Sequence, residues 1–247
     1  IFIGYFPMIA ETGTLIINGA ECEPYITSDY RAMMENPEGI LEGTRKVMEM
    51  TGVKKAYIGI ESNKPKAIKK ISGLLKGSDS IEVVPLRTRY PQGGEKQLIK
   101  AITGREVPSN GLPFQAGVVV QNVATAVAVA QAVRDGKPLV ERIVTVTGPV
   151  INEPRNFLVP IGTPLQNIVE AAGGFTEEPG KVIVGGPMMG IAQVGLEAPI
   201  VKTSNGILAL SKAESHEPNV MPCIKCARCV DVCPVYLLPL RLETFGM

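Results

Sequence analysis

The sequence predicts an α/β protein in which a mostly parallel sheet covered by helices precedes a smaller β-rich unit and a cysteine-rich segment. Within residues 1–140, apolar β-branched runs alternate with segments that have the period of amphipathic helices. The pattern changes after residues 136–138, and four of the five cysteines then crowd into residues 223–233. Alternating strands and helices indicate parallel pairing, because each helix carries the chain back to the start of the next strand.

Each expected strand of the first part is followed by a helix. We expect strands at 14–17, 56–60, 81–86 and 118–120, and helices at 37–50, 64–76, 93–102 and 122–133. The β-rich unit should hold strands at 143–147, 156–160 and 182–184 and one helix at 165–172. Glycines and prolines punctuate residues 185–199, and a polar linker at 211–219 leads into the cysteine segment.

The composition excludes several classes of protein. The chain has 247 residues, 45% hydrophobic and 20% charged, and can therefore bury at least one substantial core. The net charge of +1 is spread along the chain, so we expect no nucleic-acid partner. Polar residues interrupt the most apolar region, 117–133, and we expect no transmembrane segment. Residues 1–10 lack the features of a secretory signal, and the cysteine distribution favours a reducing, cytosolic setting.

The strongest chemical signal is the run Cys223-x2-Cys226-x2-Cys229-x3-Cys233-Pro234. This is the bacterial ferredoxin spacing, which places thiolates around a 4Fe-4S cluster. The alternatives are a structural zinc site or unligated cysteines, but zinc motifs usually pair two distant C-x2-C units. In two-cluster ferredoxins the fourth cysteine of such a run ligates the other cluster. Either Cys233 closes a single cluster or a second run lies outside this sequence, and we favour the second interpretation.

Polar loops follow three expected strands. Residues 18–24, with the sequence NGAECEP, come directly after the first strand, and residues 90–96, with the sequence YPQGGEK, precede a helix. Asn122 stands in the same position after the strand at 118–120. Open α/β sheets bind ligands at the carboxyl ends of their strands, and glycines at a helix start let backbone N–H groups approach an anion. An ordinary acidic turn is the alternative for the first loop alone, but the recurrence favours a shared site.

These segments together resemble the C subunit of the Rnf family of membrane-associated NADH and ferredoxin oxidoreductases. The resemblance rests on residues 15–25, the 90–96 loop, the helix start at Asn122 and the cysteine run, and it extends over nearly the whole chain. The same segments are similar, more distantly, to the flavoprotein subunit of respiratory complex I, which binds FMN and NADH. Departures from the complex I pattern are Ala20 and Gly94, where that subunit carries acidic residues.

The resemblance implies two 4Fe-4S clusters in the full-length protein, FMN and NAD(H). It places Glu21, Cys22 and Gly94 in the ligand-binding loops and assigns the other residues to individual cofactors. The flavin residues are Asn18, Tyr90, Gly93, Asn122 and Thr125; Glu23 and Glu95 are carboxylates near the dinucleotide, and Phe114 is a possible stacking partner. The family also has a glycine-rich flavin loop before the first strand, whereas residues 1–13 contain only Gly4 and Gly13, so we expect this chain to be an incomplete part of the subunit.

The resemblance further implies a domain order. A Rossmann-like flavin and NADH domain at 1–140 would precede a soluble ligand-binding β-grasp (SLBB) domain at 141–200 and the start of a ferredoxin-like 4Fe-4S domain at 212–247. The SLBB domain is expected to act as a scaffold. The parent protein would be a peripheral subunit on the cytoplasmic face of the bacterial membrane, docked on integral membrane and other redox subunits of an ion-pumping NADH:ferredoxin oxidoreductase. No side chain is expected to act as a catalytic acid or base, because hydride transfer needs none.

Two other functions stay open. Cobalamin reductases of the same family share a similar acidic loop and cluster run, although the Asn18-Gly19 start favours Rnf. A non-catalytic electron-relay module with a vestigial flavin site is the second alternative. Stoichiometric flavin with NADH oxidation in the full-length protein would exclude the relay.

Overall fold

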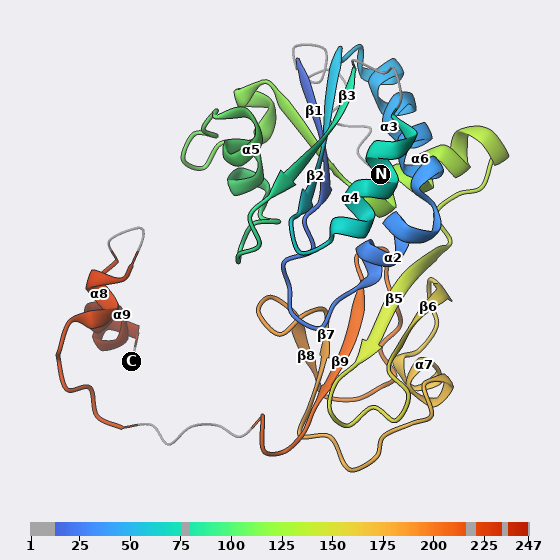
Figure 1. Cartoon of the computed structure of the whole chain (residues 1–247). Coiled ribbons are helices and arrows are strands. Elements are labelled where there is room, and N and C mark those ends of the chain that lie inside the picture. The colour runs from blue at the N-terminus through green and yellow to red at the C-terminus, as the bar shows by residue number, and fades with distance from the viewer. Residues whose placement is uncertain (1–12, 76–79, 216–220, 234–236, 247) are drawn as a thin grey trace. The chain divides into compact units, whose positions relative to one another are not determined.

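A four-stranded parallel sheet organises the first part of the chain. The computed structural model describes residues 13–75, 80–215, 221–233 and 237–246 (Figure 1). The strands lie in the order β3-β2-β1-β4, and every neighbouring pair is parallel. Their bounds are β1 Thr14–Gly19, β2 Lys55–Glu61, β3 Ile81–Leu86 and β4 Val118–Asn122.

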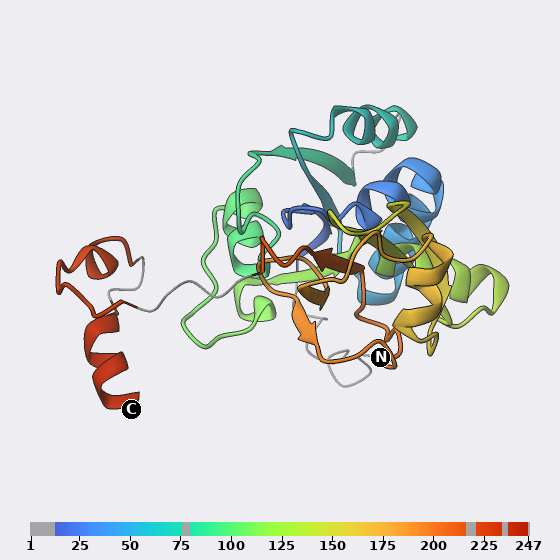
Figure 2. The same ribbon diagram turned by 90° about the horizontal axis from the view of Figure 1, so that it is seen from below.

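Helices cover both faces of this sheet, with α5 on the opposite side from α3 and α6 (Figures 1 and 2). The two sides have separate cores, because successive side chains of a strand point to opposite faces. Leu15 and Ile17 of β1 pack into the core shared with α3, α4 and α6, whereas Ile16 packs toward α5. The helices are α2 Ser28–Glu35, α3 Pro37–Thr51, α4 Pro65–Leu74, α5 Glu95–Thr103, the 3-10 turn η2 Pro113–Ala116 and α6 Val123–Asp135.

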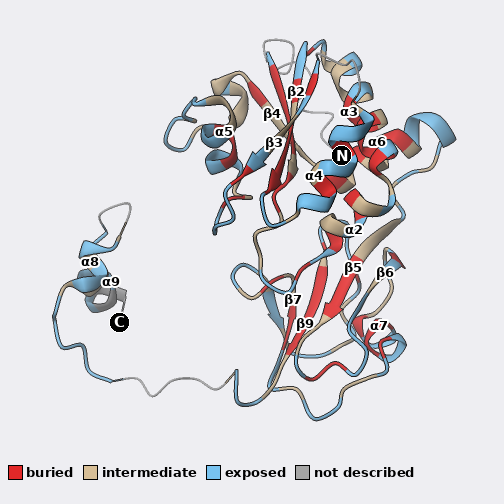
Figure 3. Cartoon of the chain, viewed as in Figure 1, coloured by how far each residue is buried: buried red, intermediate tan, exposed pale blue. Residues whose placement is uncertain are grey.

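A second, mixed sheet follows in the order β6-β5-β9-β7-β8. Only β5 and β9 are parallel neighbours, and the other pairs are antiparallel. The buried side chains of helix α7 pack on this sheet, and the buried residues of β5, β7 and β9 form a continuous band (Figure 3). The elements are β5 Glu141–Thr147, β6 Arg155–Pro160, α7 Leu165–Ala171, β7 Lys181–Val184, β8 Ile191–Gln193 and β9 Gly206–Leu210.

The chain divides into two compact units, Ile1–Ser215 and His216–Met247. Both sheets belong to the first unit. In its described residues, the second unit contains the cysteine run and the helices α8 (Arg228–Asp231) and α9 (Pro239–Gly246).

The structure confirms a mixed α/β fold with a parallel sheet followed by a second sheet, and each strand and helix expected from the sequence is present. Besides the turn η2, three further elements of the first unit were not expected: α2, β8 and β9. Strand β9 is central, because it pairs with both β5 and β7 and so joins the two halves of the second sheet.

Candidate functional site

The strand order reverses at β1, and the loops at the carboxyl ends of the strands meet beside it. The chain proceeds from β1 to β2 and β3 on one side and then returns to place β4 on the other side of β1. In open α/β sheets, the crevice at such a reversal is the usual ligand site.

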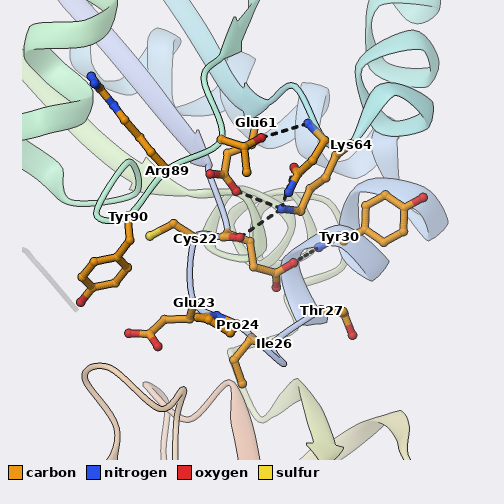
Figure 4. A pocket seen from close by; sticks show the side chains of 13 residues that line it. Cys22, Glu23, Pro24, Ile26, Thr27, Tyr30, Glu61, Lys64, Arg89 and Tyr90 are labelled. Atoms are coloured by element: carbon orange, nitrogen blue, oxygen red, sulfur yellow. Dashed lines mark hydrogen bonds and ion pairs between the residues drawn. The ribbon is translucent and has the colours of Figure 1, made fainter.

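A cavity of about 530 Å³ opens at this edge, within the range of small-molecule sites (Figure 4). Three loops contribute to its wall, one after each of β1, β2 and β3. The lining residues are Glu21, Cys22, Glu23, Pro24, Ile26, Thr27, Tyr30, Glu61, Asn63, Lys64, Thr88, Arg89 and Tyr90.

Asn18 and Gly93 fasten the first and third of these loops together. The amide Nδ2 of Asn18 donates to Gly93 O at 2.9 Å, and its Oδ1 accepts from Ala20 N at 3.0 Å. Gly93 N in turn donates to Cys22 Sγ at 3.4 Å. A Cβ at position 93 would overlap the carbonyl oxygen of Ala20, so glycine is required for this close approach.

Glu21 caps the start of helix α2. Its Oε1 accepts from Asp29 N at 2.8 Å and its Oε2 from Tyr30 N at 3.3 Å, which satisfies two N–H groups of the first helical turn. Burial, followed by the nearby Asp29 carboxylate, raises the pKa of Glu21 to about 8. Among the residues that the sequence assigned to ligand binding, Glu21 therefore has a clear architectural role.

Glu61 and Lys64 form a buried ion pair after β2. Lys64 Nζ lies 3.1 Å from Glu61 Oε2 and also donates to Glu21 O at 3.0 Å, so it joins the first two loops (Figure 4). The side chains are 12% and 1% exposed for Lys64 and Glu61, respectively. Glu61 Oε1 is buried and has no hydrogen-bond partner.

Glu23 and Tyr90 stand at the other side of the cavity (Figure 4). Glu23 Oε2 accepts from the backbone N–H of Met188 at 3.0 Å, and Glu23 Oε1 is buried without a partner. Partial burial and the Glu23 carboxylate raise the pKa of the Tyr90 hydroxyl. The wall therefore holds two carboxylate oxygens, one each on Glu23 and Glu61, that lack a donor.

Asn122 lies outside the cavity lining. Its Oδ1 accepts from Ala124 N at 2.7 Å and so caps α6, while its Nδ2 donates to Asp29 Oδ2 at 2.7 Å. Asp29 has a raised pKa because it is buried, an effect that the Asn122 hydrogen bond and the charge of Arg142 oppose. Asn122 thus connects the β4 end to α2.

The cavity brings together some of the residues predicted from the sequence. Glu21, Cys22, Glu23 and Tyr90 line it, and Asn18 and Gly93 hold its loops. The remaining predicted residues lie outside the lining: Gly94 precedes α5, Glu95 begins it, Phe114 lies in η2 and Thr125 in the first turn of α6.

The sequence interpretation missed Glu61 and Lys64. Glu61 directly follows the expected strand at 56–60, as Asn18 follows the first strand, so the same strand-end rule would have found it. Lys64 lies three residues further on, at the start of the expected helix.

The cysteine run belongs to the second unit. Cys223, Cys226 and Cys229 are exposed, and backbone N–H groups donate to Cys223 Sγ at 3.4 Å and to Cys233 Sγ at 3.3 Å. Four thiols suit a cubane cluster. However, no three His, Cys, Asp or Glu side chains of the described residues are arranged to hold a metal ion.

Two sequence expectations concern the termini and the membrane. The segment in which the family would carry its glycine-rich loop, 1–12, lies outside the described residues. Within the part of the chain that the structure describes, no helix combines the length and apolar character that a membrane span requires.

Comparison with known proteins identifies two families along the chain. Residues 7–131, about half of the sequence, match the Nuo51 FMN-binding domain, and residues 143–192 match the SLBB domain.

Curated relatives match nearly the whole chain. The C subunit of the proton-translocating ferredoxin:NAD(+) oxidoreductase complex of Clostridium ljungdahlii is 48% identical, with 97% of this chain and 52% of the relative aligned. The C subunit of the Na(+)-translocating ferredoxin:NAD(+) oxidoreductase complex of Acetobacterium woodii is 46% identical (94% and 52%), and the C subunit of the ion-translocating oxidoreductase complex of Rhodobacter capsulatus is 51% identical (93% and 44%). This chain therefore spans about half the length of these relatives.

A solved structure shares the fold. A chain of an NAD+-reducing [NiFe]-hydrogenase superposes with a TM-score of 0.69 at 21% identity. The superposition covers 85% of this chain and 43% of the hydrogenase chain. The matches confirm the resemblance to the Rnf C subunit and to complex I. The chain belongs to the family of the Nuo51 FMN-binding domain, and it is similar to the C subunits of ion-translocating oxidoreductase complexes.

Proposed function

We propose that this chain is the flavin- and dinucleotide-binding part of an ion-translocating NADH:ferredoxin oxidoreductase subunit. The observation that carries the proposal is the cavity at the carboxyl ends of β1, β2 and β3, together with the family match of residues 7–131. In the intact complex, electrons would pass between NAD(H), FMN and 4Fe-4S clusters.

The cavity fits a polyhydroxylated ligand. Glu23 Oε1 and Glu61 Oε1 are buried acceptors without donors, and leaving such groups unpaired costs roughly 1–3 kcal/mol each. Hydroxyl groups of a ribityl or ribose chain would supply the missing donors. Gly93 holds the third loop against the first loop through its N–H, which donates to Cys22 Sγ at 3.4 Å, and so keeps the two loops of the wall together.

The side chains of this chain would bind and orient the cofactors. Bound flavin would supply hydride exchange with nicotinamide and one-electron transfer to the clusters. Lys64 joins the first two loops, Asn18 joins the first and third, and Glu23 and Tyr90 present polar groups to the cavity. Glu95, Phe114, Thr125 and Asn122 would contribute only after ligand binding extends the site beyond the present lining.

The finer assignments belong to this proposal as well. The first sheet would be a Rossmann-like domain at 1–140, the second a β-grasp SLBB domain at 141–200, and 212–247 the start of a ferredoxin-like domain in which Cys223, Cys226, Cys229 and Cys233 ligate 4Fe-4S clusters. The thiolate spacing and the SLBB match of residues 143–192 support this division. The partners would be integral membrane and other redox subunits at the cytoplasmic face of the membrane.

The test is cofactor analysis of the full-length subunit, purified anaerobically with its clusters reconstituted. The proposal expects about one FMN per subunit and two 4Fe-4S clusters. Clusters without flavin would favour the electron-relay alternative, and a bound corrinoid that the reduced protein converts to its lower oxidation state would favour the corrinoid reductase.

A further inference from the structure

The loop between β7 and β8, at residues 185–190, belongs to the second sheet but contacts the candidate site in the first. The contact is made through Glu23, whose Oε2 accepts from Met188 N at 3.0 Å across 165 positions of sequence. A backbone N–H bonded to a carboxylate is a charge-assisted hydrogen bond and fixes the carboxylate more firmly than a neutral bond does.

Gly186 makes room for this carboxylate. A Cβ built at position 186 would overlap Glu23 Oε2 and would lie 2.7 Å from both Cβ and Cδ of Glu23. Gly186 has no positive φ, so its backbone would accept alanine. Glycine is needed at position 186 because a side chain there would occupy the space of the Glu23 carboxylate. It is not needed for an unusual backbone conformation.

Other residues of the loop that follows β1 also contact the second sheet. Thr27 N donates to Thr145 Oγ1 at 3.1 Å, and Ile26 Cδ1 occupies the position that a side chain of Gly206 would take. These contacts place the loop backbone, whereas the pair formed by Glu23 with the 185–190 loop places a carboxylate.

We infer that the 185–190 loop is a positioning element of the dinucleotide site: Gly186 and the Met188 N–H fix Oε2 of Glu23 so that Oε1 stays available to a donor from the bound nicotinamide dinucleotide. The inference rests on the proposed function and assigns the second sheet a part in binding beyond that of a scaffold. The orphaned Oε1 supports it, because a buried carboxylate oxygen without a donor is costly unless a ligand supplies one.

The test uses the full-length subunit with oxidised flavin and measures the Kd for NAD+ by calorimetry, which requires no turnover. Gly186→Ala should displace the Glu23 carboxylate, because its Cβ would overlap Oε2, and it should also separate the two loops slightly, because Glu23 Cβ would lie only 2.7 Å away. It should raise the Kd about tenfold or more, as expected for one misplaced charge-assisted hydrogen bond. The matched control is Gly73→Ala, whose Cβ would meet nothing within 4 Å and which should leave the Kd unchanged.

A double-mutant cycle identifies the route of the effect. In a Glu23→Gly background, Gly186→Ala should add nothing to the Kd, because both the carboxylate through which it acts and the Glu23 Cβ that it would meet are gone. Equal Kd values for Gly186→Ala and Gly73→Ala, or additive effects in the double variant, would overturn the inference. If Gly186→Ala does not fold, amide exchange decides: NAD+ should slow exchange at 185–190 in the wild type but not in Glu23→Ala, and no slowing in the wild type would overturn the inference. Failure of the wild type to bind NAD+ would instead contradict the proposed function.

Discussion

Lys64 and Glu61 form an ion pair of 3.1 Å that is buried at the carboxyl end of β2, and the same ammonium group donates to the backbone of Glu21. The pair joins two loops of the cavity wall. Removal of either partner would leave the other as an unpaired buried charge. The pair therefore stabilises the packing of the loop after β2 against the loop after β1.

Lys64→Ala should therefore destabilise the protein by about 3 kcal/mol, because Glu61 is left buried and uncompensated. The matched control is Lys100→Ala, which removes an exposed pair with Glu106 at 2.8 Å and should cost far less, because solvent screens both charges. Denaturant unfolding measures both free energies. Equal losses in the two variants would contradict the buried-pair account.

Glu21 makes the stability fall as the pH rises. Its pKa is raised from 4.5 to about 8 by burial and by Asp29, so the folded protein binds more protons than the unfolded chain between these values. The free energy of unfolding should decrease from pH 5 to pH 8, and Glu21→Gln should flatten the decrease. The raised pKa of Asp29 acts in the same direction, so part of the slope should remain.

The control for this pH dependence is Glu106→Gln. The pKa of Glu106 is lowered by its hydrogen bond and ion pair with Lys100, so its titration lies below the tested range. The Glu106→Gln variant should therefore keep the wild-type dependence of the free energy of unfolding on pH. A Glu21→Gln variant with the wild-type slope would show that Glu21 is not the group responsible.

Gly93→Ala should reduce flavin occupancy. The new Cβ would overlap Ala20 O and lie 3.3 Å from Cys22 Sγ, and because the first obstacle is backbone, the loops must separate. We expect a loss of stability of about 1–3 kcal/mol as well. Flavin content measured against Gly73→Ala, which faces open space, isolates the steric effect. Full occupancy in Gly93→Ala would place the flavin elsewhere.

We expect the iron content of the subunit to depend on the cysteine run at 223–233 and not on Cys22. In the reconstituted full-length subunit, Cys229→Ser should remove about half of the iron, because one of two cubane clusters loses a ligand. Cys22→Ser serves as the control, since Cys22 accepts a hydrogen bond from Gly93 in the first unit. Iron and sulfide analysis would contradict the assignment if the two variants retained equal iron.

Local sequence patterns predicted most of the fold. The strands and helices of the parallel sheet followed from hydrophobic period, but α2 did not, because Thr27 provides no side-chain cap and the first-turn N–H groups bond to Glu21. Strand β9 was missed because its sequence, GILAL, is short and becomes a strand through pairing with β5 and β7. Both depend on contacts between distant parts of the chain.

Part of the candidate site could likewise be recognised from local sequence, whereas another part depends on contacts between distant segments. The first loop, Tyr90 and Gly93 were recognisable because they follow strands, and the same rule applied to Glu61 would have extended the site. The contact between Glu23 and Met188 had no local signal, because it arises only when the second sheet packs against the first loop.

Binding of a nicotinamide dinucleotide at the cavity is tested by titrating the purified, flavin-loaded full-length subunit with NADH under anaerobic conditions while the flavin absorbance is recorded. NADH should bleach the flavin, and Glu23→Ala should require a higher NADH concentration for the same bleaching. A flavin that NADH leaves oxidised, while dithionite reduces it, would contradict the assignment of this cavity to a nicotinamide dinucleotide.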